Sequence, residues 1–252
     1  MNEFKLIKKY LRPLSLNKPG TFMLTDDIFF DKKKGIAVST DTYVQGTHFI
    51  NVDPKNFVKK VFRASLSDLF CKGIIPKIYF LSISLNKKLT NHDWLSKVKK
   101  ILYKDQKKFN VFLGGGDTTY SPKLSITITV LGQSKKKPIL RKGSMNDDDI
   151  YVTGNIGDSY LGLSVLKKNK NFNKLNKYFK KKYLEPDIPS WISPYLSKIA
   201  SSSIDISDGL AQDLQHLCKN SKNGALINLD LLPLSFPCSI LVKNKKIKHK
   251  NF

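Results

Sequence analysis

The sequence is poor in cysteine and has no long hydrophobic run. Its 252 residues include three cysteines, Cys71, Cys218 and Cys238, which lie far apart and form no C-x-x-C pair. This spacing disfavours a zinc site and a disulfide framework, and it is typical of a reducing compartment. No apolar run could span a bilayer, and the first residues lack the charged and apolar regions of a secretory signal. We therefore expect a cytoplasmic globular protein with no membrane partner.

Arginine is scarce, although the chain is strongly basic. The formal net charge is +24, but Arg12, Arg63 and Arg141 are the only arginines, and lysine supplies the rest of the positive charge. Arginine is the preferred residue for bidentate contacts with phosphates and bases. The lysines are spread over predicted helix faces and loops, which favours a solvated basic surface. A basic RNA-binding protein is kept as an alternative from a different functional class.

The common nucleotide-binding motifs are also absent. The sequence has no G-x-x-x-x-G-K-[ST], no G-x-G-x-x-G after a predicted strand and no kinase catalytic-loop pattern. If the protein binds nucleoside phosphates, we expect it to hold them through metal ions rather than through a glycine loop and a lysine.

One stretch, Phe112 to Thr119, combines an apolar strand, three glycines, Asp117 and two threonines. Glycine permits positive φ and a close approach of the backbone to a ligand. We expect a strand at 111–113 that ends in a glycine turn and presents Asp117 at the strand end. A carboxylate there suits a metal ion held against a phosphate. A glycine-rich hairpin with an ordinary turn aspartate explains the same residues.

Hydrophobic periodicity predicts an α/β (α+β) chain. Apolar spacing indicates helices at 54–72 and 92–108, and strands at 36–42, 77–85 and 124–130. The last of these strands alternates strictly, as expected for a half-exposed strand of an antiparallel sheet.

A segment rich in lysine, proline, glycine and aspartate at 133–148 suggests a domain boundary. We expect an N-terminal domain at 1–137 and a C-terminal domain at 138–240. Further strands are expected at 149–153, 203–206 and 225–229. The lysine-rich tail at 241–252 is expected to be disordered, because it lacks apolar periodicity.

Six aspartates lie at predicted strand or helix ends: Asp27, Asp41, Asp68, Asp117, Asp205 and Asp208. If they converge, mutual repulsion raises their pKa values and costs stability unless divalent cations are present. Mg²⁺ prefers carboxylates and phosphate oxygens, so such a cluster favours phosphoryl transfer. Simpler readings stay open, namely a surface turn at Asp27, helix capping near Asp208 and a structural role for His48.

Six short motifs occur in order along residues 4 to 235. They are Ser39-Thr40-Asp41-Thr42 with Gly46-x-His48-Phe49, Leu66-Ser67-Asp68-Leu69, Gly115-Gly116-Asp117-Thr118-Thr119, Arg141-Lys142-Gly143, Tyr151-Val152-Thr153-Gly154 with Gly157-Asp158-Ser159, and Ile204-Asp205-Ile206-Ser207-Asp208-Gly209-Leu210. Each is weak alone, but the ordered set resembles the thiamine-monophosphate kinase family. That family belongs to the superfamily of aminoimidazole ribonucleotide synthetase, HypE and selenophosphate synthetase.

The resemblance implies a two-domain PurM-like fold. The N-terminal domain would hold a mixed or antiparallel sheet packed with helices, would bind ATP and Mg²⁺ and would pair into a homodimer. The C-terminal α/β domain would be incomplete. The implied reaction transfers the γ-phosphoryl group of ATP to thiamine phosphate and gives thiamine diphosphate. No covalent enzyme intermediate is expected, so catalysis would rest on positioning and charge neutralisation.

The resemblance also assigns roles to individual residues. The metal positions would be Asp27, Ser39, Thr40, Asp41, Asp68, Asp117, Asp205 and Asp208, with several Mg²⁺ ions bound. Gly116, Asp117, Arg141 and Ser207 match ATP-contacting positions, and His48 matches a contact with thiamine phosphate.

Two departures from the family pattern qualify these expectations. Thr25 stands where the family usually has a glycine before two aspartates. The family also continues beyond the last residue with segments that contact thiamine, so we expect a truncated chain whose ATP and Mg²⁺ sites survive while substrate recognition is impaired. The alternatives are a superfamily relative with another phosphate acceptor and an inactive remnant.

Overall fold

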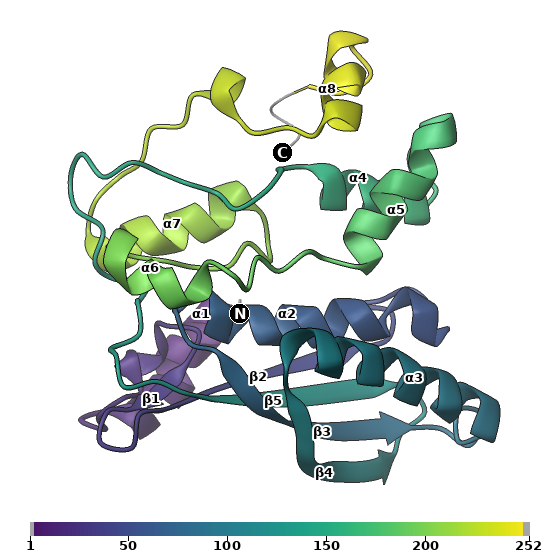
Figure 1. Cartoon of the computed structure of the whole chain (residues 1–252), viewed down its shortest axis with the longest axis horizontal. Helices are drawn as coiled ribbons and strands as arrows, with labels where there is room; N and C mark the ends of the chain where they lie inside the picture. The colour runs from purple at the N-terminus through teal and green to yellow at the C-terminus, as the bar shows by residue number, and fades with distance from the viewer. Residues whose placement is uncertain (1–2, 249–252) are drawn as a thin grey trace.

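The computed structural model describes residues 3–248, and all of its strands lie within residues 29–133 (Figure 1). The strands are β1 (Phe29–Asp31), β2 (Ile36–Val44), β3 (Pro76–Leu85), β4 (Phe112–Tyr120) and β5 (Ser125–Gln133). The helices are α1 (Glu3–Leu6), α2 (Val58–Phe70), α3 (His92–Phe109), α4 (Asp158–Leu166), α5 (Asn176–Leu184), α6 (Ser193–Ile199), α7 (Leu210–Ser221) and α8 (Phe236–Lys243).

The five strands form one mixed sheet in the order β1-β2-β5-β3-β4. Strand β5 pairs antiparallel with both β2 and β3, whereas β4 pairs parallel with β3 at the edge. The parallel pair is possible because α3 carries the chain back between the two strands. The prediction of a mixed N-terminal sheet packed with helices is therefore confirmed.

Helices α2 and α3 form where the apolar spacing predicts them. Asn91 accepts a hydrogen bond from the Trp94 N–H at 2.9 Å and so caps α3, and Asn110 ends this helix in the left-handed conformation. In α2, Phe62, Leu66 and Leu69 are fully buried. They belong to a core that also contains Tyr79, Ile126 and Ile128 of the sheet, so α2 covers one face of it.

The glycine-rich stretch differs from the prediction. Strand β4 runs straight through the three glycines to Tyr120, so no glycine turn forms. The pairing register with β3 shifts at Gly114, and a Cβ on Gly116 would lie 1.8 Å from the carbonyl oxygen of Leu81. Glycine is therefore required because the two backbones approach closely, and the edge strand extends because it pairs with β3.

The second face of the sheet is open in the described part of the chain. Rows of hydroxyl groups cross it, with Thr40 bonded to Thr129 at 2.9 Å and Thr42 bonded to Thr127 at 2.8 Å. Successive residues of a strand point to opposite faces. The side chains of Ser39 and Asp41 therefore point to the face covered by α2.

Residues 138–248 contain helices and extended segments but no strand. The predicted strands at 149–153, 203–206 and 225–229 are wrong. A strand needs a neighbour for its backbone hydrogen bonds, and no strand lies beside these segments within residues 138–248. In place of the expected α/β domain, this part of the chain is a helical arrangement with a small core of its own, which includes Leu161 and Phe179. The domain bounds at 137 and 240 stay predictions.

The predicted disordered tail is wrong for residues 241–248. Helix α8 continues to Lys243, and Leu241 and Ile247 are buried in the small C-terminal core. The aliphatic side chains of residues 241–248 pack against apolar residues of α4 and α5, although this segment shows no helical periodicity. Residues 249–252 lie outside the described part of the chain. None of the helices in residues 3–248 is long and apolar enough to cross a membrane.

Candidate active site

Four of the predicted aspartates converge where α2 meets the C-terminal half. Asp27 precedes β1, Asp41 lies in β2, Asp68 lies in the last turns of α2, and Asp205 lies in the segment before α7. Ligand atoms of Asp27, Cys71 and Asp205 lie within 4.8 Å of one another. The cluster is therefore built from segments far apart in the sequence.

The environment of three of these carboxyl groups disfavours their charged form. Burial, followed by the charges of Asp41, Asp205 and Asp27, raises the pKa of Asp68 well above its ordinary value. Burial also raises the pKa of Asp41, and burial together with Asp27 raises the pKa of Asp205 to about 6. Such shifts, caused by desolvation and like charges, are typical of functional sites.

Asp27 has the opposite electrostatic environment. Lys72 lies 2.7 Å from its Oδ2, and Arg141 donates to both of its oxygens from Nε and Nη2. Burial opposes the ionisation of Asp27, but Lys72 and Arg141 outweigh burial and lower its pKa. Asp26 accepts a hydrogen bond from the Arg141 N–H at 2.7 Å, so both aspartates hold the segment at 141 against the N-terminal half.

Hydroxyl groups orient the other three carboxylates. Ser39 donates to Asp68 Oδ2, and Ser67 donates to Asp205 Oδ2 at 2.7 Å. Tyr43 donates to Asp41 Oδ2 at 2.9 Å. These bonds leave further lone pairs on each carboxylate.

The donor set fits a hard divalent cation. Asp41, Asp68 and Asp205 supply only oxygen, and none of them takes part in an ion pair within residues 3–248. Mg²⁺ prefers carboxylate oxygens and retains several waters, whereas the half-buried thiol of Cys71 is a softer ligand. Divalent cations held by these carboxylates would offset the repulsion that raises their pKa values.

The structure does not bring Asp117 into the cluster. Asp117 pairs with Ser82, which pairs with Thr127 on the open face. Asp41 points to the other face of the sheet, and two strands separate β2 from β4, a distance of about 14 Å at the usual strand spacing. The side chain of Thr40 also lies on the open face, so a metal contact from Thr40 at the cluster requires its backbone. The roles implied for Gly116 and Asp117 stay predictions.

Ser207 and Asp208 are exposed and lie outside the cluster. The N–H groups of Ser207, Asp208 and Gly209 all donate to Asp213 Oδ2, at 2.9–3.1 Å. Asp213, rather than Asp208, therefore organises the start of α7. Metal binding by Asp208 and ATP contact by Ser207 stay predictions.

His48 lies on the loop after β2, beside Tyr43. Its Nδ1 accepts a hydrogen bond from the Val44 N–H at 2.9 Å, so the proton of the neutral ring is on Nε2. The side chain is exposed, which leaves Nε2 as a donor for a ligand.

Sequence reasoning missed Lys72, Asp26 and Asp213. Lys72 lies two residues after the end of α2, and its partners Asp26 and Asp27 are too far away in the sequence for any local spacing to indicate the pairing. Thr25 proves compatible with the site, because its φ of −113° requires no glycine. Its hydroxyl donates to the Phe22 carbonyl oxygen at 2.8 Å.

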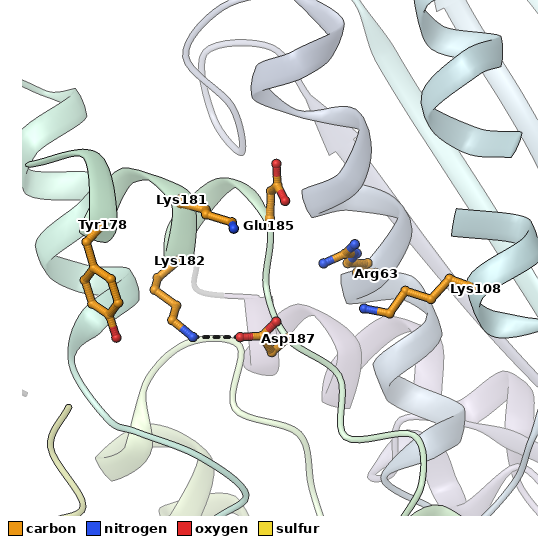
Figure 2. A pocket seen from close by; sticks show the side chains of 7 residues that line it. All are labelled: Arg63, Lys108, Tyr178, Lys181, Lys182, Glu185 and Asp187. Carbon is orange, nitrogen blue, oxygen red and sulfur yellow. Dashed lines mark hydrogen bonds and ion pairs between the residues drawn. The ribbon is translucent and has the colours of Figure 1, made fainter. Parts of the chain in front are cut away.

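A pocket of about 420 Å³ lies away from the aspartate cluster (Figure 2). Figure 2 shows Arg63 and Lys108 on one wall, facing Lys182 of α5 and Asp187 in the segment after that helix. Its lining carries both signs of charge, and Lys182 lies 2.7 Å from Asp187. Because none of the four clustered aspartates lines it, this pocket is separate from the candidate metal centre.

Comparison with known proteins identifies the family. A family model described as AIR synthase related protein, N-terminal domain, matches residues 25–134. Thiamine-monophosphate kinase of Buchnera aphidicola subsp. Schizaphis graminum is 40% identical over 255 residues, which cover 98% of this chain and 77% of that protein. The chain belongs to the thiamine-monophosphate kinase family. The Escherichia coli K12 thiamine-monophosphate kinase is 35% identical, with 92% of this chain and 73% of that protein covered.

Solved structures show the fold of the thiamine-monophosphate kinase family in this chain. A structure described as AaThiL complexed with AMPPCP and TMP superposes with a TM-score of 0.88 at 24% identity, covering 99% of this chain and 80% of that one. Escherichia coli HypE gives a TM-score of 0.63 at 16% identity, covering 99% and 79%. The chain spans about three quarters of the length of these relatives. The reaction of the family is the ATP-dependent conversion of thiamine monophosphate to thiamine diphosphate.

Proposed function

We propose that this chain catalyses phosphoryl transfer from ATP to thiamine phosphate at the aspartate cluster. An oxygen of the thiamine phosphate attacks the γ-phosphorus of ATP, the bond to the bridging oxygen breaks, and ADP leaves. The observation that carries the proposal is the convergence of Asp41, Asp68 and Asp205, which have no ion-pair partner within residues 3–248, in a chain that is 40% identical to a thiamine-monophosphate kinase.

We propose that Asp41, Asp68 and Asp205 hold Mg²⁺, with Asp27 bordering the same space. Bound Mg²⁺ would neutralise phosphate oxygens and orient them for in-line transfer. The protein's part is to keep the carboxylates fixed before the substrates arrive, through the hydroxyls of Ser39, Ser67 and Tyr43.

We propose that Arg141 and His48 supply hydrogen-bond donors for the two substrates. Arg141 uses Nε and Nη2 on Asp27, and its Nη1 has no hydrogen-bond partner within residues 3–248. A guanidinium held in this way can still donate to a phosphate of ATP. The exposed Nε2 of His48 is suited to donate to thiamine phosphate. The complex recorded for AaThiL with AMPPCP and TMP supports both ligand classes.

We also propose that the protein is a homodimer that pairs through the open face of the sheet. This face carries the hydroxyl rows of Thr40, Thr42, Thr127 and Thr129, together with the exposed ring of Phe80. Nothing within residues 3–248 covers it, and a face with apolar and hydroxyl groups suits a second copy of the same chain.

The experiment that tests the proposed function measures ADP formation with Mg²⁺, with and without thiamine phosphate. The sequence led us to expect impaired substrate recognition, whereas the proposed function predicts turnover that depends on thiamine phosphate, so this measurement decides between the two. Asp68→Asn should lose about 10²-fold or more of the turnover because a transition-state charge partner is removed. Asp93→Asn, which changes an exposed aspartate of α3, is the matched control and should retain turnover. Equal turnover in Asp68→Asn and the parent chain would contradict the proposed role of the cluster.

A further inference from the structure

Lys72 lies inside the aspartate cluster and has no exposed side-chain surface. It follows the last turn of α2, and its Nζ lies 3.1 Å from Asp26 Oδ1 and 2.7 Å from Asp27 Oδ2. The same nitrogen donates to the carbonyl oxygen of Ser203 at 2.7 Å. An ammonium group has three donors, so the protein itself satisfies all three.

The charges of Asp26 and Asp27 are balanced by protein cations, without a metal ion. Asp26 and Asp27 carry two negative charges, and Lys72 and Arg141 supply two positive charges at ion-pair or hydrogen-bond distance. Both oxygens of Asp27 already face these cations. Asp41, Asp68 and Asp205 take part in no such ion pair within residues 3–248, so the charge that a divalent cation would neutralise lies with them.

Lys72 also joins the two halves of the site. Its Nζ holds the carbonyl oxygen of Ser203, two residues before Asp205, and its own carbonyl oxygen accepts from the Ile139 N–H at 3.1 Å. Asp205 is held in addition by Ser67, which lies on the same helix. The end of α2 therefore sets the position of the segment that carries Asp205.

We propose that Lys72 is a built-in counter-ion of the metal centre, which takes the place of one divalent cation at Asp26 and Asp27. The Mg²⁺ ions are then left to Asp41, Asp68 and Asp205. This inference rests on the proposed function, because it divides the same acids between metal ions and a protein cation. Lys72 is a positioning residue, since it contacts the carboxylates and the Ser203 carbonyl group rather than the substrates.

The test compares the parent chain with Lys72→Met by titration calorimetry with MgCl₂ and by thermal unfolding with and without Mg²⁺. Removing one positive charge next to Asp26 and Asp27 should add a Mg²⁺ site or strengthen Mg²⁺ binding by about tenfold. Without Mg²⁺ the variant should unfold at a lower temperature than the parent, and Mg²⁺ should recover most of that loss. Lys182→Met removes a lysine from an exposed ion pair and should change neither result.

A second variant separates charge from packing. Lys72→Met/Asp26→Asn removes one charge of each sign, so it should lose the added Mg²⁺ dependence and regain stability in the absence of Mg²⁺. Unchanged Mg²⁺ binding in Lys72→Met would overturn the proposal, and so would a variant that neither Mg²⁺ nor Asp26→Asn restores. If the parent chain itself binds no Mg²⁺, the proposed function fails as well, which is a distinct result.

Discussion

At the scale of single residues, Lys60 combines a half-buried side chain with a position next to the candidate substrate contact. Its Nζ donates to the His48 carbonyl oxygen at 2.8 Å and to the Tyr183 hydroxyl at 2.6 Å, and it lies 3.9 Å from the centre of the Tyr183 ring. Burial lowers the pKa of Lys60 to about 8. Lys60 therefore couples the loop that carries His48 to the end of α5.

The lowered pKa of Lys60 predicts a specific pH dependence of stability. In the unfolded chain lysine keeps its proton up to its ordinary pKa, so between about pH 8 and 10 the unfolded state binds more protons than the folded state. The free energy of unfolding should therefore rise with pH in this window. We expect that rise to be smaller in Lys60→Met, measured by urea unfolding at several pH values.

The neighbouring Lys59 supplies the control for this experiment. Lys59 pairs with Glu185 at 2.9 Å, so Lys59→Met should keep the rise seen in the parent chain. Parallel curves for the parent chain and Lys60→Met would contradict the assignment of the rise to Lys60.

The residues of the site differ in how far the sequence predicts them. Asp41 and Asp68 could be named because each lies near the end of an element predicted from periodicity, whereas Asp27 and Asp205 were assigned as metal positions through the resemblance to the family. Lys72 could not be weighed against the other lysines, because its role comes from burial against Asp26 and Asp27, which only the folded chain creates. Charge type is visible in a sequence, whereas burial and partners are not.

At the scale of elements, α2 is held to α3 by a buried ion pair. Arg63 donates from Nε and Nη2 to both oxygens of Asp105, at 2.7 and 3.0 Å, and the two side chains are 7% and 4% exposed. Arg63 also donates from Nη1 to the Pro186 carbonyl oxygen at 3.0 Å, beside the pocket in Figure 2. One guanidinium thus connects α2, α3 and the segment after α5.

Breaking this pair should destabilise the protein strongly. Arg63→Met leaves the Asp105 carboxylate buried without a partner, so we expect the free energy of unfolding to fall by about 3–5 kcal/mol. Urea unfolding at neutral pH measures the change. Arg63→Met/Asp105→Leu should recover a large part of it, because no unpaired charge remains. A double variant no more stable than the single one would show that packing, rather than charge, dominates.

The elements of the N-terminal half were predictable because their signals are local. Apolar spacing and caps place α2, α3, β2, β3 and β5 within a few residues. Strand β4 was misread because its glycines serve the close pairing with β3, a contact that a single stretch of sequence does not reveal. The strands predicted after residue 138 failed for the related reason that an extended segment becomes a strand only beside another strand.

At the scale of the whole molecule, the open sheet face predicts an oligomer. Thr127→Arg places a charged side chain among the hydroxyl rows of this face, so it should convert a dimer into a monomer. Light scattering coupled to size-exclusion chromatography measures the mass. The parent chain should show about twice the mass of one chain, and Thr90→Arg, in an exposed turn away from the sheet, should not change it. A dimer that survives Thr127→Arg would require another interface.

The net charge of +24 is a property of the whole molecule and also suits an RNA-binding protein. The aspartate cluster distinguishes a phosphoryl-transfer enzyme from such a protein. A phosphoryl-transfer enzyme depends on its buried carboxylates, whereas RNA binding through surface lysines would be indifferent to Asp68→Asn and would weaken steeply with salt. The central claim is therefore that the cluster directs the γ-phosphoryl group of ATP to thiamine phosphate.

The most direct measurement of that claim follows the label of γ-³²P-ATP with Mg²⁺ and thiamine phosphate. We predict that the label appears in thiamine diphosphate, and that Asp68→Asn slows its transfer by about 10²-fold or more while Asp93→Asn does not. Label that stays in ATP, or that passes only to inorganic phosphate, in the parent chain would contradict the account.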